Sequence, residues 1–91
     1  MQGENNMGKA AFVKKFSDFL IENVPYYSDV KSLVYVVDND NNEWLYCNYK
    51  SYSQKRINVN CDSEQAIILD FINRIEDTDW IVPMDKEIYN K

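Results

Sequence analysis

The chain has 91 residues, of which 45% are hydrophobic and 14% aromatic, so it can bury one core and is too rich in large apolar side chains for a disordered protein. Fifteen acidic residues against ten basic ones give a net charge of −5, which disfavours direct binding to the phosphates of nucleic acids. We expect one folded domain whose electric field attracts basic surfaces.

The chain opens with a polar stretch and continues with an amphipathic helix. Residues 1–7 show no periodicity, which predicts a flexible lead-in before a single domain over residues 8–91. From Gly8 onward, apolar residues recur at helical spacing on one side: Phe12, Val13, Phe16, Phe19 and Leu20. Pro25 ends this helix just after Asn23, because its ring removes a backbone donor and disfavours helix in the residue before it.

A β-hairpin is predicted next. Leu33–Val37 is an uninterrupted β-branched and aromatic run, and Trp44–Tyr49 is a second strand-forming run. The residues "DNDNN" between them tolerate the left-handed backbone of tight turns, so the two strands are predicted to be antiparallel. After the looser segment "KSYSQK", apolar and polar residues alternate over Arg56–Cys61, which predicts a third strand at a sheet edge with one face in water.

A second helix is predicted directly after the third strand. Asp62 stands three residues before Gln65, the spacing of a reciprocal capping pair at a helix start. The helical stripe that follows consists of Ile67, Ile68, Phe71, Ile72 and Ile75. Trp80–Val82 is then predicted as an extended segment and Met84–Tyr89 as a short final helix. Two apolar helix faces need a sheet to cover, so we predict a compact α+β domain: helix, three-stranded antiparallel sheet, helix and a short C-terminal helix.

The sequence offers little for catalysis or metal binding. It has no His and no glycine-rich loop, and neither Cys47 nor Cys61 has basic surroundings, so we predict a protein that is not an enzyme and needs no cofactor or metal. Two reduced thiols, together with the lack of a secretory signal pattern, predict a cytoplasmic location, in the host cell if a phage encodes the protein. Whether the cysteines are bridged stays open, because a turn about Gln54 would set them opposite each other.

The hairpin tip carries three carboxylates and no basic residue: Asp38, Asp40 and Glu43. A magnesium nuclease site would need a nearby lysine, and a calcium loop would need a glycine and a final glutamate that the tip lacks. Turn chemistry alone favours Asp and Asn here. Carboxylates on a stiff hairpin also imitate phosphates, however, so Arg and Lys side chains that bind DNA can bind them. With Asn39 and Asn42, these residues form the predicted binding tip.

A second acidic patch, Glu76, Asp77 and Asp79, follows the second helix beside Trp80. Carboxylates at a helix C-terminus oppose the helix dipole and gain nothing locally. The patch therefore fits either a solvated helix end or a partner-binding surface. Tyrosines are also candidate interface residues, although several must belong to the core: Tyr26, Tyr27, Tyr46, Tyr49, Tyr52 and Tyr89.

The element order and the run "VDNDNNEW" resemble the small acidic phage anti-CRISPR proteins, which inhibit the type II RNA-guided DNA nuclease by mimicking DNA. That family has a similar series of asparagine, aspartate, small residue, asparagine, glutamate and aromatic residue at its first hairpin. The resemblance implies that Asp40 and Glu43, with Asn39 and Asn42 beside them, meet the arginines that read the short duplex motif beside the target. Asn41 stands where the family has a glycine. The link between the second and third strands is longer here, and the C-terminal acidic run is thinner.

The expected function is that of a non-catalytic, acidic inhibitor that occupies the DNA-binding groove of a CRISPR effector nuclease. Its partner is then a protein with a basic, nucleic-acid-binding surface, with no direct contact to nucleic acid or membrane, and it acts as a monomer or a homodimer. Two alternatives stay open. An immunity protein or antitoxin would use the same acidity against a basic toxin, and a small accessory module would use its aromatic face to self-associate.

Overall fold

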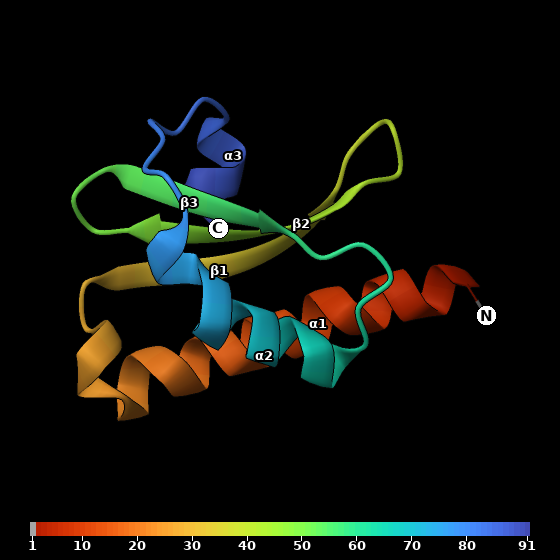
Figure 1. Ribbon diagram of the computed structural model, residues 1–91, viewed down its shortest axis with the longest axis horizontal. Coiled ribbons are helices and arrows are strands. Elements are labelled where there is room, and N and C mark those ends of the chain that lie inside the picture. Colours follow the sequence, from red (N-terminus) through yellow and green to blue (C-terminus); the bar gives the residue numbers. More distant parts are fainter. Residues whose placement is uncertain (1) are drawn as a thin grey trace.

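The computed structural model describes the backbone of residues 2–91 and the side chains from Gly8 onward. It confirms the α+β fold, with helices and strands in the predicted order (Figure 1). The elements are α1 (Gln2–Asn23), the 3-10 helix η1 (Pro25–Tyr27), β1 (Val30–Val37), β2 (Glu43–Tyr49), β3 (Ser53–Asn58), α2 (Glu64–Arg74), the 3-10 helix η2 (Ile75–Asp77) and α3 (Lys86–Tyr89).

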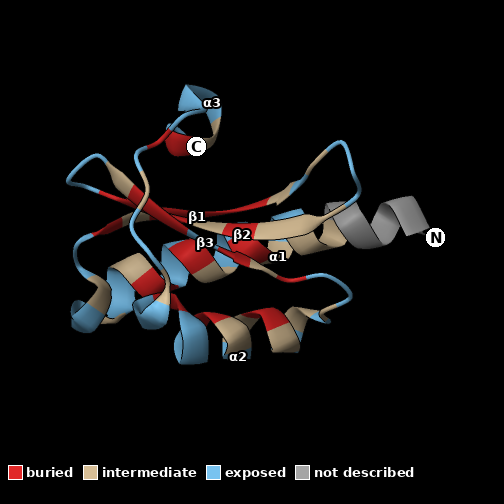
Figure 2. Ribbon diagram, turned by 45° about the horizontal axis from the view of Figure 1, so that its top comes forward, coloured by how far each residue is buried: buried red, intermediate tan, exposed pale blue. Residues whose placement is uncertain are grey.

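The three strands form one antiparallel sheet in the order β1-β2-β3. Val37 pairs with Glu43 in the first hairpin, and Leu45 pairs with Ile57 across β2 and β3. The long helices α1 and α2 lie on one side of the sheet, and α3 lies on the other (Figure 2). Figure 2 also shows the buried residues on the helix faces that are turned to the sheet. None of the helices described is long and apolar enough to cross a membrane.

Each long helix buries a narrower stripe than the sequence predicts. Val13 and Leu20 are buried on α1, but Phe19 is 57% exposed; on α2, Phe71 is buried and Ile72 is 53% exposed. On α1, part of the buried face is polar where it covers the edge strand of the sheet. The buried Ser17 lies on this face, and its Oγ accepts the backbone N–H of Leu33 at 2.9 Å. The prediction for Phe19 and Ile72 is therefore wrong.

The third strand begins three residues earlier than predicted. The turn between β2 and β3 occupies residues 50–52, and Tyr52 takes a left-handed conformation with φ 57. As a result Cys47 pairs with Lys55 rather than facing Cys61, and both thiols are free. Gln54, predicted in the loop, is buried in β3 and forms an isolated bridge with Ile81.

The remaining boundaries differ by a few residues. The N-cap of α2 is Ser63, whose Oγ accepts the Ala66 N–H at 3.1 Å, so the capping pair predicted from Asp62 is wrong. The short helix α3 begins at Lys86, after Asp85 accepts two backbone N–H groups. The helix α1 begins at Gln2, before the predicted start. The flexible lead-in predicted for residues 1–7 falls outside the described side chains and stays a prediction. The boundary between this lead-in and a single domain over residues 8–91 stays a prediction too.

Candidate protein-binding surfaces

Asp38 organises the hairpin tip. Its Oδ1 accepts the backbone N–H groups of Asp40 and Asn42 at 2.9 and 3.0 Å, and its Oδ2 accepts Trp44 Nε1–H at 3.0 Å. The bond from Trp44, then those from the backbone, and the charge of Arg56 hold the pKa of Asp38 below its usual range. This carboxylate is engaged inside the turn, so its main role is to fix the loop.

Glu43 is held by the body of the protein rather than presented at the tip. Its Oε1 accepts hydrogen bonds from Lys9 Nζ at 2.8 Å and Tyr35 OH at 2.6 Å, and its Oε2 accepts the Cys61 N–H at 3.0 Å. Burial acts to raise its pKa, but these bonds and the Lys9 charge outweigh burial and lower it. The side chains of both ion-pair partners are mostly buried. The absence of a nearby cation in the sequence was therefore misleading.

The outermost part of the tip consists of Asn39, Asp40 and Asn41, which are all exposed. Asn41 takes the left-handed backbone conformation with φ 65, which glycine and asparagine adopt more readily than other residues. Among the described side chains, the Asp40 carboxylate has no hydrogen-bond or ion-pair partner. Asn42 is fixed instead, since its Oδ1 accepts Asn60 Nδ2–H at 3.0 Å. Of the residues predicted at the tip, Asp40 and Asn39 are the ones presented to solvent.

The outer face of the sheet carries an arginine that stacks on one aromatic ring and donates a hydrogen bond to the hydroxyl of another. The guanidinium of Arg56 lies 4.1 Å from the Trp44 ring centroid and 5.9 Å from that of Tyr46, and its Nη1 donates to Tyr46 OH at 3.2 Å. Arg56 is exposed. Beside it an apolar pocket of about 440 Å³ runs to Ile81, Val82, Met84 and Ile88. Nothing in the sequence pattern predicted this stacking, which depends on the register of β2 and β3.

The second acidic patch lies in and after η2. Glu76, Asp77 and Asp79 are all exposed there. Glu76 Oε2 accepts the hydroxyl of Tyr26, a residue of η1 fifty positions earlier in the chain. This bond, followed by the Glu76 charge, raises the pKa of Tyr26. The acidic patch on η2 is thus in contact with η1 through Tyr26.

Lys55, a buried residue of β3, forms hydrogen bonds to the backbone of η2, the segment that carries this patch. It is only 6% exposed, and its Nζ donates to the carbonyl oxygens of Ile75 and Glu76 at 3.2 and 3.3 Å. The same Nζ lies 4.5 Å from the centroid of the Trp80 ring. A lysine in this position satisfies carbonyl groups at the end of a helix and complements its dipole. The sequence signal for this site was Lys55, a charged residue at a position where the alternation of β3 points inward. The prediction missed it because it began the third strand at Arg56, one residue after Lys55.

A cleft of about 280 Å³ opens between η1, the ends of β2 and β3, and η2. Its lining combines aromatic rings, two carboxylates and one ammonium: Tyr26, Tyr27, Asp29, Tyr49, Lys55, Ile75, Glu76 and Trp80. Tyr26 and Trp80 are 68% and 57% exposed, so their rings form open walls. Tyr49 lies deeper, with its ring centroid 4.7 Å from that of Trp80. We call this the aromatic–acidic cleft.

The two predicted acidic patches are not brought together. The tip extends beyond the Glu43 end of β2, whereas η2 and Trp80 lie towards its Tyr49 end, where Trp80 packs on Tyr49 (Figure 1). A single small ligand therefore does not contact both. A partner protein that uses both patches has to extend along the sheet.

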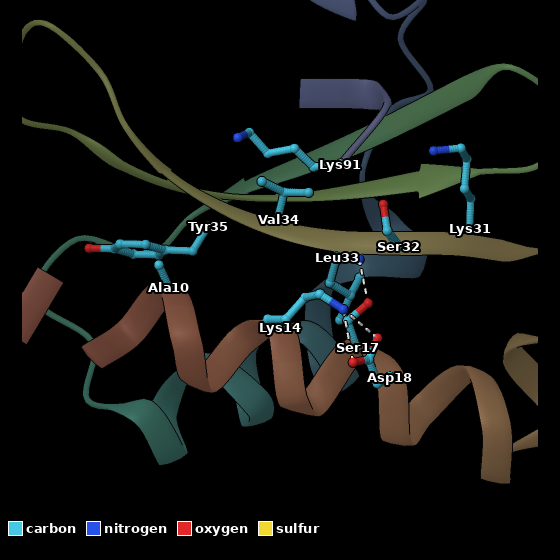
Figure 3. Close-up of a pocket in the computed structure, with 10 residues that line it drawn as sticks. All are labelled: Ala10, Lys14, Ser17, Asp18, Lys31, Ser32, Leu33, Val34, Tyr35 and Lys91. Carbon is cyan, nitrogen blue, oxygen red and sulfur yellow. Dashed lines mark hydrogen bonds and ion pairs between the residues drawn. The ribbon is translucent and has the colours of Figure 1, made fainter. Parts of the chain in front are cut away.

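A third pocket lies between α1 and the free side of β1, and three lysines are among its lining residues (Figure 3). Lys14 donates to both carboxylate oxygens of Asp18 at 2.9 Å, and Lys31 donates to the Tyr89 carbonyl at 2.7 Å. In Figure 3, Lys31 and Lys91 lie on the opposite side of β1 from Lys14. The lysines do not converge on one point, so they do not form an anion site.

Groups suited to catalysis are scarce in the described residues. Burial raises the pKa of Cys47 to about 12, which keeps this thiol protonated and unreactive at neutral pH. No group of three or more His, Cys, Asp or Glu side chains in the described part is placed to hold a metal ion. Asp62 has a buried Oδ2 without a hydrogen-bond partner. Its pKa rises to about 6, because of burial and then the neighbouring Asp70, while Arg74 and Lys9 oppose the rise.

Comparison with known proteins found no family model that matches the chain. No curated protein and no solved structure was found to be significantly similar to it either.

Proposed function

We propose that this protein is a non-catalytic inhibitor that binds the basic, nucleic-acid-binding surface of a partner protein, as anti-CRISPR proteins do. The proposed partner is the DNA-binding groove of an RNA-guided nuclease, and the proposed place of action is the cytoplasm of the cell that contains it. The tip inserts into the groove, and the acidic patch on η2 provides a second contact.

The observation that carries this proposal is the fixed, projecting tip. Hydrogen bonds from the turn and from Trp44 to Asp38 hold the loop in one conformation. The loop between β1 and β2 projects beyond the sheet (Figure 1), and Asn39 and Asp40 are exposed in this loop. An anion held in place on a rigid loop loses little conformational entropy on binding, so its attraction to arginine is retained in the complex.

The test is inhibition of DNA binding by purified type II RNA-guided nucleases. A panel of guide-loaded nucleases is mixed with this protein, and binding of a labelled target duplex is measured by gel shift. We expect at least one nuclease to lose DNA binding at an excess of the protein. Inhibition should weaken as salt rises and should be lost in Asp40→Lys, because the charge at the tip is reversed.

The control variant is Asp18→Asn, which removes an exposed carboxylate on α1 that pairs with Lys14 away from the tip. It should inhibit like the wild type. Full inhibition by Asp40→Lys would contradict the role of the tip. Unchanged DNA binding across the panel would contradict the choice of partner and would favour the antitoxin alternative, which a panel of basic toxins then tests.

A further inference from the structure

We infer that the aromatic–acidic cleft is a receptor for an arginine side chain of the partner protein. This inference deepens the proposed function, because it rests on a partner with a basic surface and names the group that the second acidic patch receives. It concerns the opposite end of the sheet from the tip, and so it can fail independently.

The charge of the cleft selects a cation. Two carboxylates, Asp29 and Glu76, line it against one ammonium, that of Lys55. The Lys55 ammonium already donates to two carbonyl groups and lies against the Trp80 ring, so its donors are largely used within the protein, and the two carboxylates leave the lining with a net negative charge. Negative potential also reaches the interior, since the charges of Asp29 and Glu76 both contribute to raising the pKa of Tyr49, which burial raises most. Asp77 and Asp79 add further negative charge nearby.

The shape and chemistry of the walls select a guanidinium among cations. Tyr26 and Trp80 present exposed ring surface, and a planar guanidinium stacks on aromatic faces while it donates to a carboxylate in its plane. One such acceptor is Glu76, because Tyr26 occupies its Oε2 and no described group bonds to its Oε1. The volume of about 280 Å³ suits one side chain rather than a drug-sized ligand. The stacking of Arg56 on Trp44 shows the same pairing within this chain.

The cleft is also built rigidly enough to serve as a receptor. The backbone N–H of Lys50 donates to the Asp29 carbonyl at 2.9 Å, which ties the segment before β1 to the β2–β3 turn. Lys55 joins β3 to the end of α2 and η2. Three segments that are distant in the sequence are therefore fixed around one opening, which reduces the entropy cost of binding.

The experiment is an NMR titration of the labelled full chain with the capped tripeptide Ac-Gly-Arg-Gly-NH2. The indole N–H of Trp80 reports on the cleft, and that of Trp44, held by Asp38, is an internal control in the same spectrum. We expect a saturable shift at Trp80 and none at Trp44. The lysine peptide should bind more weakly, and the uncharged citrulline peptide should not bind.

Variants test whether binding depends on the carboxylate and on the aromatic ring that line the cleft. Glu76→Gln should raise the dissociation constant of the arginine peptide about fivefold, which is the scale of one partly exposed ion pair. Tyr26→Ala should also weaken binding, whereas Tyr26→Phe keeps the ring and should preserve it. Asp18→Asn, which removes an exposed carboxylate of α1 that does not line the cleft, should leave the constant unchanged. Thermal melting of each variant verifies that it is folded.

Several results would overturn the inference: equal binding of the citrulline peptide, binding of a glutamate peptide instead, an equal shift at Trp44, or no effect of Glu76→Gln. The titration needs no nuclease, so its outcome is separate from the gel-shift test. Arginine binding without nuclease inhibition supports the cleft and rejects the partner. Inhibition that depends on Asp40 without arginine binding rejects the cleft alone.

Discussion

At the scale of single residues, carboxylates that look alike in the sequence have different roles. Glu43 and Asp40 lie three positions apart, but Glu43 accepts three hydrogen bonds from other parts of the chain while Asp40 is exposed. We expect Glu43→Gln to lower the free energy of unfolding by about 1–2 kcal/mol, because an ion pair with Lys9 is lost and the remaining bonds weaken. Asp40→Asn should leave it unchanged. Urea denaturation of both variants measures the difference, and equal stabilities would contradict the assignment.

A second prediction at this scale concerns Asp38. Replacing it with Ala removes acceptors for two backbone N–H groups and for the Trp44 indole, so the tip should lose its fixed conformation. Amide hydrogen exchange at Asp40 and Asn42 should become faster, with a lower melting temperature. Exchange at Leu45, in the buried centre of β2, serves as the reference. Unchanged protection at the tip would show that backbone bonds alone hold the turn.

At the scale of elements, Lys55 connects β3 to the end of α2 and η2. Lys55→Met keeps most of the apolar stem but leaves the carbonyl groups of Ile75 and Glu76 without their donor. We expect it to lower the free energy of unfolding by about 1–2 kcal/mol, and Lys55→Ala to lower it further, because the stem is lost too. Denaturation curves compare the two variants. A Met variant as stable as the wild type would mean that removing the buried charge compensates for the lost bonds.

The same elements show which features local sequence can predict. The turn of the first hairpin was predicted closely because two β-branched and aromatic runs flank residues with a strong turn preference, although β1 begins at Val30, three residues before its predicted start. The third strand was misplaced, since Tyr52 takes a left-handed conformation that its residue type does not indicate. Contacts between distant segments, such as Lys9 with Glu43 or Tyr26 with Glu76, have no local signal at all. The sequence therefore identified the acidic residues as candidates. Only the contacts between distant segments show that Glu43 is held within the protein and that Asp40 is exposed.

At the scale of the whole molecule, titrating groups act on stability in two separate pH ranges. The pKa values of Glu43 and Asp38 are lowered in the folded state, so the stability they contribute is present above their unfolded pKa values and is lost as pH falls through the folded ones. Asp62 acts in the opposite sense, because its folded pKa of about 6 lies above its unfolded value. The folded chain then binds more protons than the unfolded chain between roughly pH 4 and 6.

Stability should therefore pass through a maximum near about pH 4 and decline towards neutral pH, as Asp62 ionises beside Asp70. Asp62→Asn removes this charge and should raise the melting temperature at pH 7 by about 4–8 °C, if the gain is about 1 kcal/mol after solvent screening. At about pH 2.5 the variant and the wild type should melt together, because this pH lies well below the ordinary aspartate pKa of about 3.9 and the carboxyl group is protonated in both folded and unfolded wild-type chains. Calorimetry at both pH values measures the effect. Equal melting temperatures at pH 7 would show that Arg74 and Lys9 fully compensate the charge, since they are the cations that lower the pKa of this carboxyl group.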